Sequence, residues 1–226
     1  MKRYYSEYSK FFVSVDCIIF GFEDGELRIL IGRRNMDPGR GENTIYGGFV
    51  DEKESVDDAA VRVLYELTGL EGIYMQQVGA FGKVDRDPGA RVVTVAYYAL
   101  IKTSDYDPTL AAKHNVRWVS VNDIPPMFGD HNRIVQQARQ EMRMKLAKEP
   151  VGFRLLPELF TLTQLQKLYE AVNGCEMDKR NFRKHVKEMP YIEKTEHVDK
   201  KCSKRGACLY KFNEQKFNEM EHKFRM

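Results

Sequence analysis

Two spacings of apolar residues alternate along the first two thirds of the chain and divide it into strands and helices. The apolar runs FFVSVDCIIFGF and LRILIGRR flank Glu23-Asp24-Gly25-Glu26, and an Asp-Gly turn between such runs predicts a β-hairpin over residues 11–34. Further strands are expected near residues 44–50, 73–81, 91–102 and 115–121, with helices over 55–68 and about 130–147. This succession predicts a mixed α/β sandwich over roughly residues 10–147.

The segment at 55–68 has the clearest helical pattern. Ser55 and Asp58 have the spacing of a capping box, and Gly69 stands where a helix stop is expected. The apolar residues recur every three or four positions and should form one buried face: Val56, Ala59, Ala60, Val63, Leu64 and Leu67.

The last third of the chain predicts a helix-turn-helix. FTLTQLQKLYEAV opens with Thr161 and Gln164 at capping-box spacing, and Asp178 is a good N-cap for a second helix, KRNFRKHVKEM. That second helix has an apolar side of Phe182, Val186 and Met189. Its other side is basic and fits a recognition helix in the major groove of DNA. The expected DNA-binding residues of this helix are Lys179, Arg180, Asn181, Arg183, Lys184 and Lys187.

The next segment, YIEKTEHVDKKCSKRGACLYKF, predicts two strands joined by a basic loop, which is the wing of a winged helix. Basic side chains at the wing should contact phosphates, whereas Arg180, Asn181 and Arg183 should reach base edges. The expected wing contacts are Lys200, Lys201, Lys204 and Arg205. The alternative is a small helical domain with a basic surface that binds another protein.

Composition and charge support two domains. Pro150 and Pro157 interrupt the chain at KEPVGFRLLPELF, so we expect one domain at residues 1–150 and a second at 151–226. Residues 151–226 carry 16 Lys and Arg against 11 Asp and Glu, whereas residues 1–150 have a net charge of −2. Such basic clustering favours a polyanionic partner. The four cysteines lack Cys-x-x-Cys spacing and are expected to be reduced thiols. No apolar run predicts a membrane span or a signal peptide, so we expect a cytoplasmic protein without membrane contact.

A pattern of polar residues overlies the helix at 55–68. From Gly48 to Leu70 the order is Gly, five residues, Glu54, seven residues, Arg62 and then VLYELTGL. This stretch resembles the Nudix box of nucleoside-diphosphate-X hydrolases, which runs Gly, five, Glu, seven, Arg-Glu-hydrophobic-any-Glu-Glu-any-Gly-hydrophobic. The frame matches over 23 positions without a gap. The resemblance implies the Nudix α/β/α sandwich for the first domain.

Two of the three glutamates that follow the arginine in that box are absent, because Val63 and Leu67 stand in their places and only Glu66 remains. Hydrolysis of a pyrophosphate needs clustered carboxylates that hold Mg²⁺ against phosphate oxygens. We therefore expect no enzymatic activity, no catalytic residue, no metal site and no cofactor. The alternative is a Mg²⁺-dependent pyrophosphohydrolase acting on ADP-ribose or a related nucleoside diphosphate. Three other acids could then replace the missing ones: Asp51, Asp57 and Asp58.

Together the two halves resemble the Nudix-related transcriptional regulators, which join an N-terminal Nudix domain to a C-terminal winged helix. The phrase LLPELFTLTQLQKLYEAV is the most distinctive part of a resemblance that spans nearly the whole chain. It implies a homodimer that binds double-stranded operator DNA and senses a small effector through its Nudix domain. The sequence is most similar to the arabinose-utilisation branch, which implies a repressor of sugar utilisation genes with a pentose, L-arabinose, as effector. ADP-ribose, which other branches sense, is the second choice.

Charge gives one physical argument about the effector. A diphosphate favours a metal or a dense set of basic groups, whereas a neutral sugar needs planar hydrogen-bonding partners and an aromatic face. The loss of two box glutamates weakens the first option more than the second. By analogy with the family, six residues are expected to line the effector cleft: Arg34, Tyr46, Asp51, Glu66, Asp85 and Arg91. Each has a structural alternative, such as a solvated strand end or core packing.

Overall fold

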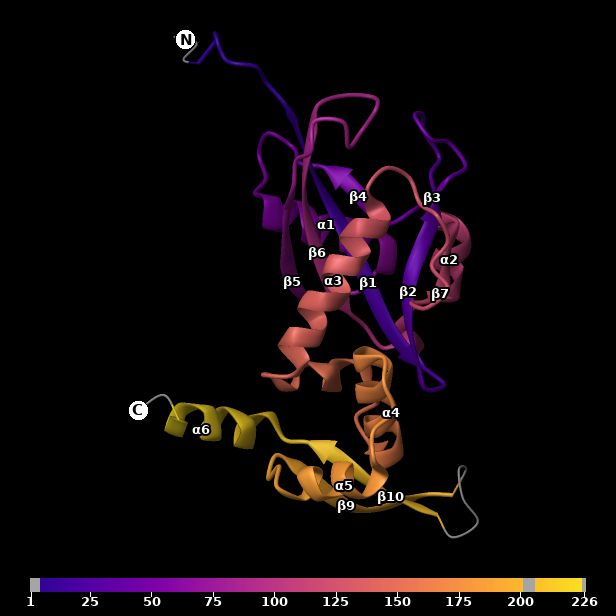
Figure 1. Cartoon of the computed structure of the whole chain (residues 1–226), viewed down its shortest axis with the longest axis vertical. Coiled ribbons are helices and arrows are strands. Elements are labelled where there is room, and N and C mark those ends of the chain that lie inside the picture. Colours follow the sequence, from indigo (N-terminus) through magenta and orange to yellow (C-terminus); the bar gives the residue numbers. More distant parts are fainter. Residues whose placement is uncertain (1–4, 201–205, 225–226) are drawn as a thin grey trace. The chain divides into compact units, whose positions relative to one another are not determined.

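The computed structural model describes residues 5–200 and 206–224, with side chains up to residue 220. The chain forms two compact units (Figure 1). The first comprises Met1–Gly21 and Arg28–Met144, and the second comprises Phe22–Leu27 and Lys145–Met226. The domain limits expected from the sequence, 1–150 and 151–226, stay a prediction.

The first unit is built on a seven-stranded mixed sheet of order β3-β2-β1-β6-β5, in which β4 also pairs with β1 and β7 with β2. The long strand β1 runs parallel to β6 and antiparallel to β4. The strands are β1 Phe12–Glu23, β2 Glu26–Arg33, β3 Asn43–Thr44, β4 Tyr46–Phe49, β5 Tyr74–Phe81, β6 Val92–Leu100 and β7 Val116–Ser120. The helices of this unit are α1 Val56–Thr68, η1 Thr103–Asp105, α2 Pro108–His114 and α3 His131–Leu146.

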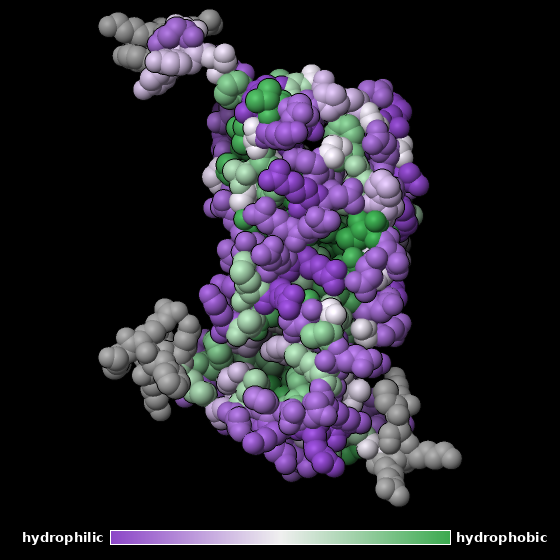
Figure 2. All heavy atoms as spheres, in the orientation of Figure 1, coloured by the Kyte–Doolittle hydropathy of each residue, from purple (hydrophilic) through white to green (hydrophobic). Residues whose placement is uncertain are grey.

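Helices α1 and α3 lie on opposite faces of this sheet (Figure 1). Successive side chains of a strand point to opposite faces, so Val15, Cys17 and Ile19 of β1 pack in the same core cluster as the buried side of α1. The residue between the first two, Asp16, faces the other way and lies beside His131 at the start of α3. The outward side of α3 is hydrophilic (Figure 2). The alternation along β1 therefore separates an apolar core on one face from a charged group on the other.

The strongest sequence signals are confirmed. Ser55 caps α1 through a complete capping box with Asp58, and Gly69 ends the helix with a φ of 68°. The turn between β1 and β2 has Asp24 and Gly25 at φ 52° and 84°, the left-handed region that such hairpin turns require. Four helical elements of the described residues were not predicted: the 3-10 helix η1, α2, the 3-10 helix η2 at Pro150–Leu155, and the helix α6 at Glu214–Phe224. The prolines near residue 150 were expected to exclude regular structure, which was wrong, because Pro150 begins η2, where its missing N–H costs nothing.

The second unit has the winged-helix order of elements. Its helices and strands are η2, β8 Phe160–Thr161, α4 Leu162–Asn173, α5 Lys179–Lys187, β9 Ile192–Asp199, β10 Ala207–Phe212 and α6. The three strands form a sheet of order β8-β10-β9. Thr161 and Gln164 form the expected capping box, and Phe153 stacks on Phe212 with ring centroids 4.5 Å apart. None of the helices formed by residues 5–200 and 206–224 is both long and apolar enough to span a bilayer.

Candidate functional site

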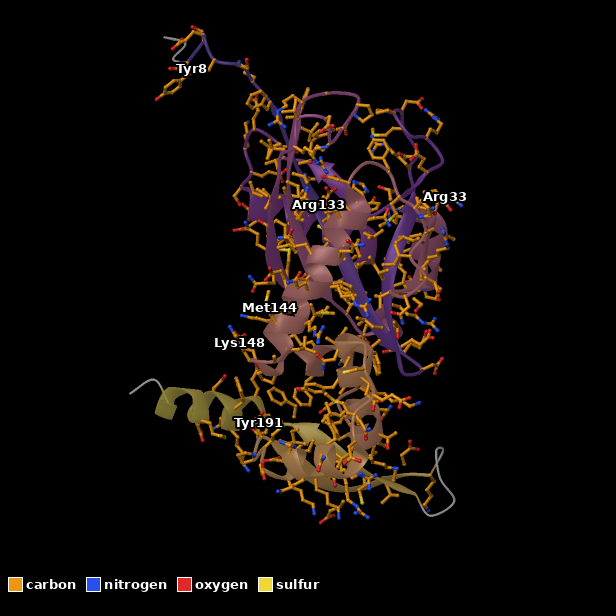
Figure 3. All side chains as sticks on the ribbon, in the orientation of Figure 1. Tyr8, Arg33, Arg133, Met144, Lys148 and Tyr191 are labelled. Carbon is orange, nitrogen blue, oxygen red and sulfur yellow. The ribbon has the colours of Figure 1, made fainter. Side chains whose placement is uncertain are left out.

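A cleft of about 660 Å³ opens in the first unit, where several elements end. Its walls come from the carboxyl end of β2, from β4, from the last two residues of α2 and from the first residue of α3. Arg33, labelled in Figure 3, marks the end of β2 on one wall. The sheet fixes the place of the cleft, and the loops and helix ends around it supply its chemistry.

Two glycines of β4 form part of the lining. A Cβ on Gly47 would lie 2.5 Å from both Asp16 Oδ1 and the Val15 carbonyl oxygen, so no larger residue fits without moving β1. A Cβ on Gly48 would lie 3.0 Å from Val63 Cγ2 of α1. The Gly-Gly pair therefore lets β4 approach β1 and α1 closely.

The walls of the cleft are strongly basic. Arg33, Arg34, Arg40, Arg86 and Lys113 all line it, against the two carboxylates of Asp16 and Asp87. The Arg33 Nη1 atom donates to the Gly41 carbonyl oxygen at 2.8 Å, and Arg34 donates to that of Pro38. The Arg34 guanidinium lies 4.1 Å from the centroid of the Phe128 ring, a cation-π contact. The arginines of this wall are thus held by backbone and ring contacts that leave other N–H groups to bind an anion.

The deep end of the cleft holds a buried ionic network. Arg86 donates to Asp16 at 3.2 Å and to Asp130 at 2.9 Å, and its side chain is almost inaccessible to solvent. Burial lowers the pKa of His131, although the charge of Asp16 opposes that shift. The Ile45 amide donates to His131 Nδ1 at 3.4 Å, which places the imidazole proton on Nε2, 4.0 Å from Asp16 Oδ1. His131 is therefore a neutral donor beside a carboxylate that Arg86 already compensates.

Tyr46 contributes an aromatic group to the same cleft. Its hydroxyl lies 3.2 Å from His114 Nδ1, and the two rings pack edge to face with centroids 5.7 Å apart. Burial, with a smaller contribution from Glu66, raises the pKa of Tyr46, so the phenol stays protonated at neutral pH. The cleft thus offers aromatic surface beside its basic groups.

The Nudix-box residues of α1 are arranged differently from a carboxylate cluster. Arg62 binds Glu54 at 2.7 Å and Glu66 at 3.4 Å, and it also donates to the Phe49 carbonyl oxygen at 3.0 Å. The hydrogen bonds from Arg62 lower the pKa of Glu54. Val63 and Leu67 are each 1% exposed and belong to the core cluster. Within the described part of the chain, no three His, Cys, Asp or Glu side chains gather closely enough to hold a metal ion.

The six residues expected at the cleft divide into two groups. Arg34 and Tyr46 line it. The other four do not: Asp51, Glu66, Asp85 and Arg91. Asp85 pairs with Lys83 at 3.1 Å, which lowers the pKa of the Asp85 carboxyl, and both side chains are exposed. These four were assigned from the family pattern, and their roles in binding stay predictions.

Several lining residues were missed by the sequence reasoning. His114 ends α2, which was itself not predicted, although Asp107-Pro108 is a helix-start signal that could have found it. His131 begins the predicted helix near residue 130, but nothing local indicates that it faces Asp16. Arg86 and Phe128 lie in loops and reach the cleft only through the folded chain.

The second unit carries the expected DNA-binding helix. Asp178 caps α5 by accepting from the Asn181 amide at 2.8 Å, and Glu188 caps its other end, so the helix is two residues shorter than predicted. Val186 faces the core. All six expected contacts on the other side are exposed and form what we name the α5 basic face: Lys179, Arg180, Asn181, Arg183, Lys184 and Lys187. Lys200 is exposed after β9, whereas Lys201, Lys204 and Arg205 lie outside the described residues.

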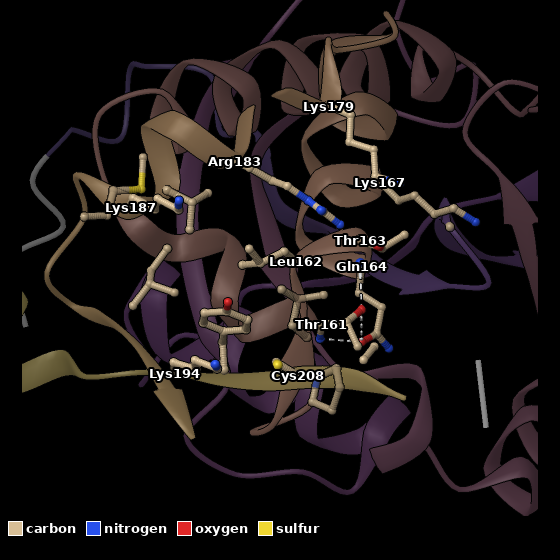
Figure 4. Close-up of a pocket in the computed structure, with 18 of the residues that line it drawn as sticks. Thr161, Leu162, Thr163, Gln164, Lys167, Lys179, Arg183, Lys187, Lys194 and Cys208 are labelled. Atoms are coloured by element: carbon tan, nitrogen blue, oxygen red, sulfur yellow. Dashed lines mark hydrogen bonds between the residues drawn. The ribbon is translucent and has the colours of Figure 1, made fainter. Parts of the chain in front are cut away.

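A groove of about 1500 Å³ runs beside this face (Figure 4). The basic residues of α5 line it together with Lys167 of α4 and Lys194 of β9, which the sequence reasoning did not include. Thr161 and Gln164 stand at its edge, joined by the capping hydrogen bonds drawn in Figure 4. The unit therefore presents both a convex basic helix and a concave basic groove.

Two known domain families match the chain. The NUDIX domain covers residues 10–138, and the NrtR DNA-binding winged helix domain covers residues 152–212. The chain belongs to the Nudix-related transcriptional regulators. A curated relative from Acinetobacter baylyi, the ADPR responsive transcriptional repressor NtrR, is 33% identical over 217 residues, which are 94% of this chain and 86% of that protein.

Two solved structures of the same family resemble this one. NrtR of Shewanella oneidensis, complexed with a 27mer DNA, is 29% identical and superposes with a TM-score of 0.79, covering 88% of this chain and 93% of that one. The NUDIX domain of the same protein, complexed with ADP ribose, is 27% identical with a TM-score of 0.52, covering 62% of this chain and 94% of that one. The Nudix sandwich followed by a winged helix is thereby confirmed, and the protein is a Nudix-fold transcriptional regulator with a DNA-binding domain. The arabinose branch is not confirmed, since none of these relatives has a name that refers to arabinose.

Proposed function

We propose that this regulator is a repressor that binds operator DNA through its winged helix and senses ADP-ribose, or a close nucleoside diphosphate, in the Nudix cleft. The carrying observation is the lining of that cleft by Arg33, Arg34, Arg40, Arg86 and Lys113. A diphosphate supplies two adjacent anionic groups for such a set, and aromatic rings such as Tyr46 and Phe128 suit a nucleoside. The names of the Acinetobacter and Shewanella proteins point to the same ligand.

L-Arabinose fits this lining less well. Arg86 is paired with Asp16 and Asp130, but a neutral pentose would displace water from Arg33, Arg34 and Lys113 without offering them an anionic partner, which is unfavourable. The missing glutamates favoured a neutral sugar over a diphosphate, but the number of basic groups in the cleft favours the diphosphate. Neither a sugar effector nor a role in carbohydrate metabolism has support among the relatives.

Hydrolysis of the effector is the competing function. Arg62 forms ion pairs with Glu54 and Glu66, the two carboxylates of the box that this chain keeps. Val63 and Leu67, which replace the other two, are buried in the core. The side chains present therefore do not fit Mg²⁺. We propose that the cleft binds its ligand without cleaving it. Release of AMP from ADP-ribose on addition of Mg²⁺ would show instead that an enzyme remains.

The first experiment is a fluorescence-anisotropy titration against duplex DNA from the gene's own neighbourhood, with ADP-ribose or with L-arabinose. We expect salt-sensitive, sequence-selective binding that ADP-ribose weakens and L-arabinose leaves unchanged. We also propose a homodimer, so the titration should saturate at two chains per operator with two half-sites. An absence of selective binding under all conditions contradicts the proposal.

Arg34 provides a test of the cleft. Replacing Arg34 with Gln removes a charge-assisted contact to the diphosphate and is expected to weaken ADP-ribose binding about tenfold, measured by calorimetry. Arg91→Gln is the matched control, because Arg91 lies outside the lining and donates only to backbone carbonyls. Equal losses in both variants would show that the ligand does not occupy this cleft.

Arg183 provides a test of base recognition. Replacing Arg183 with Ala is expected to cost about 1–3 kcal/mol in operator binding and to relax the preference for one base pair. The measurement is a titration against operators that differ at single positions. If discrimination is unchanged, α5 is not the helix that reads the bases.

A further inference from the structure

His131 lies at the deep end of the cleft and has hydrogen-bonding partners on only one of its ring nitrogens. The residue is 6% exposed and lines the cleft. The Thr44 hydroxyl and the Ile45 amide lie 3.1 and 3.4 Å from Nδ1. Nε2 lies 4.0 Å from Asp16 Oδ1, which is too far for a hydrogen bond. No described residue therefore accepts the Nε2 proton, so this buried donor is available to a ligand in the cleft.

The partners of Nδ1 suit both protonation states of the ring. In the neutral ring, Nδ1 accepts from the Ile45 amide. In the charged ring, Nδ1 carries a proton, and Thr44 Oγ1 can accept it because the Thr44 hydroxyl donates to the Ile45 carbonyl oxygen at 2.8 Å. The ring can therefore gain a proton without moving, and only the long contact with the Ile45 amide is lost.

The charges of the first unit that act on this ring cancel one another. They come from four segments: Asp16 of β1, Arg34 after β2, Arg86 after β5 and Asp130 before α3. Two of them are acidic and two are basic, and Arg86 pairs with both acids. Burial therefore decides the balance and lowers the pKa of His131. The amino terminus of α3, where His131 stands, also favours the neutral ring.

We propose that His131 is a proton-linked contact for the diphosphate: a phosphate oxygen of the effector accepts the Nε2 proton, and Nδ1 takes up a proton from solvent as the effector binds. This inference rests on the proposed function and adds to it a dependence of effector binding on pH. A phosphate within hydrogen-bonding distance favours the imidazolium, because it adds negative charge where the other charges cancel. A neutral sugar would add no charge and would cause no such uptake.

The sign of the pH dependence follows from the two states. The pKa of His131 lies below its ordinary value without effector, and the bound diphosphate should raise it. At a pH between those two values, binding takes up a proton, so affinity falls as pH rises. We expect the affinity for ADP-ribose to fall about tenfold from about pH 6 to about pH 8.

Calorimetry measures the uptake directly. The observed binding enthalpy changes with the ionisation enthalpy of the buffer in proportion to the protons taken up, so ADP-ribose is titrated at neutral pH in PIPES and in imidazole. The natural chain should take up on the order of half a proton. His131→Gln keeps an N–H donor but cannot titrate, so its uptake should vanish and its affinity should not depend on pH.

Two further variants complete the test. Thr44→Val leaves His131 in place but removes the acceptor for the charged ring, so it should reduce the uptake even if His131→Gln fails to fold. His197→Gln is the matched control, because His197 is exposed in the second unit, and the uptake should be unchanged.

Binding of ADP-ribose without proton uptake would overturn the inference, as would equal uptake in His131→Gln and the natural chain. Loss of the uptake in His114→Gln alone would assign the proton to the other histidine of the cleft and would also overturn it. A chain that does not bind ADP-ribose would contradict the proposed function. NMR titration with sulfate as the anion would then decide the inference. The imidazole resonance that His131→Gln lacks should titrate at higher pH in sulfate, and an unchanged titration would overturn the assignment.

Discussion

Replacing Val63 with Glu should lower the free energy of unfolding by about 4 kcal/mol, because it buries a carboxylate without a partner. Val63 is 1% exposed among Ala59, Ala60 and Leu67 of the same helix, and its Cγ2 lies against the Gly48 backbone. The substitution restores a letter of the Nudix box, yet we expect no hydrolysis. The side chain would enter the core, or it would disrupt the contact between α1 and β4.

The measurement can be confined to the unit concerned. Trp118 is the single tryptophan of the sequence and packs against the core cluster that contains Val63. Its fluorescence during urea denaturation therefore reports the first unit. Val61→Glu is the matched control, because Val61 is 57% exposed on the same helix and should change stability by less than about 0.5 kcal/mol. Unchanged stability of Val63→Glu together with Mg²⁺-dependent hydrolysis would contradict both the core assignment and the proposal that the cleft binds without cleaving.

Replacing Lys179, Lys184 and Lys187 together with Ala should weaken DNA binding roughly 100-fold near 0.15 M salt. Each phosphate contact contributes about 0.9 to the slope of log affinity against log salt, so three contacts should reduce that slope by about 2.7. The loss should be similar for all DNA sequences, because contacts to phosphates carry no base information.

The control for this variant removes three charges elsewhere. Lys10, Lys53 and Lys148 are exposed and lie outside both the cleft and the groove. Replacing them with Ala gives a variant with the same net charge as the α5 variant. A difference in DNA binding between the two variants is therefore due to the position of the lysines and not to total charge. Anisotropy titrations at several salt concentrations measure the affinity for DNA and its dependence on salt. Equal salt slopes for the two variants would show that the α5 basic face does not contact the backbone of DNA.

The fold could be predicted from the sequence wherever short-range patterns determine it. The stripe on α1, the Asp24-Gly25 turn and the cap at Thr161 each depend on residues within one or two turns of chain. The cleft depends on contacts between distant residues, such as Arg86 with Asp16 and Tyr46 with His114. No local pattern encodes those contacts. Of the six residues that the family pattern suggested, Arg34 and Tyr46 line the cleft, whereas four lie outside that lining: Asp51, Glu66, Asp85 and Arg91.

The charge of the cleft could not be predicted from local sequence patterns either. The sequence contains many arginines and lysines, and nothing in their spacing indicates that Arg33, Arg40, Arg86 and Lys113 converge. The missing glutamates were visible, and they favoured a neutral ligand. The folded chain brings in cations from four separate segments, which outweighs that argument.

The apolar side chains at positions 63 and 67 also bear on how such a chain can evolve. Each is a member of the core that joins α1 to the sheet, so placing a glutamate at either position alone would cost stability. A path back to a hydrolase would need several coordinated changes, including a polar surrounding for the new carboxylates. If the domain binds without cleaving, as proposed, selection acting on one substitution at a time would meet a loss of stability at each step, so the filled core at these two positions would make the change hard to reverse.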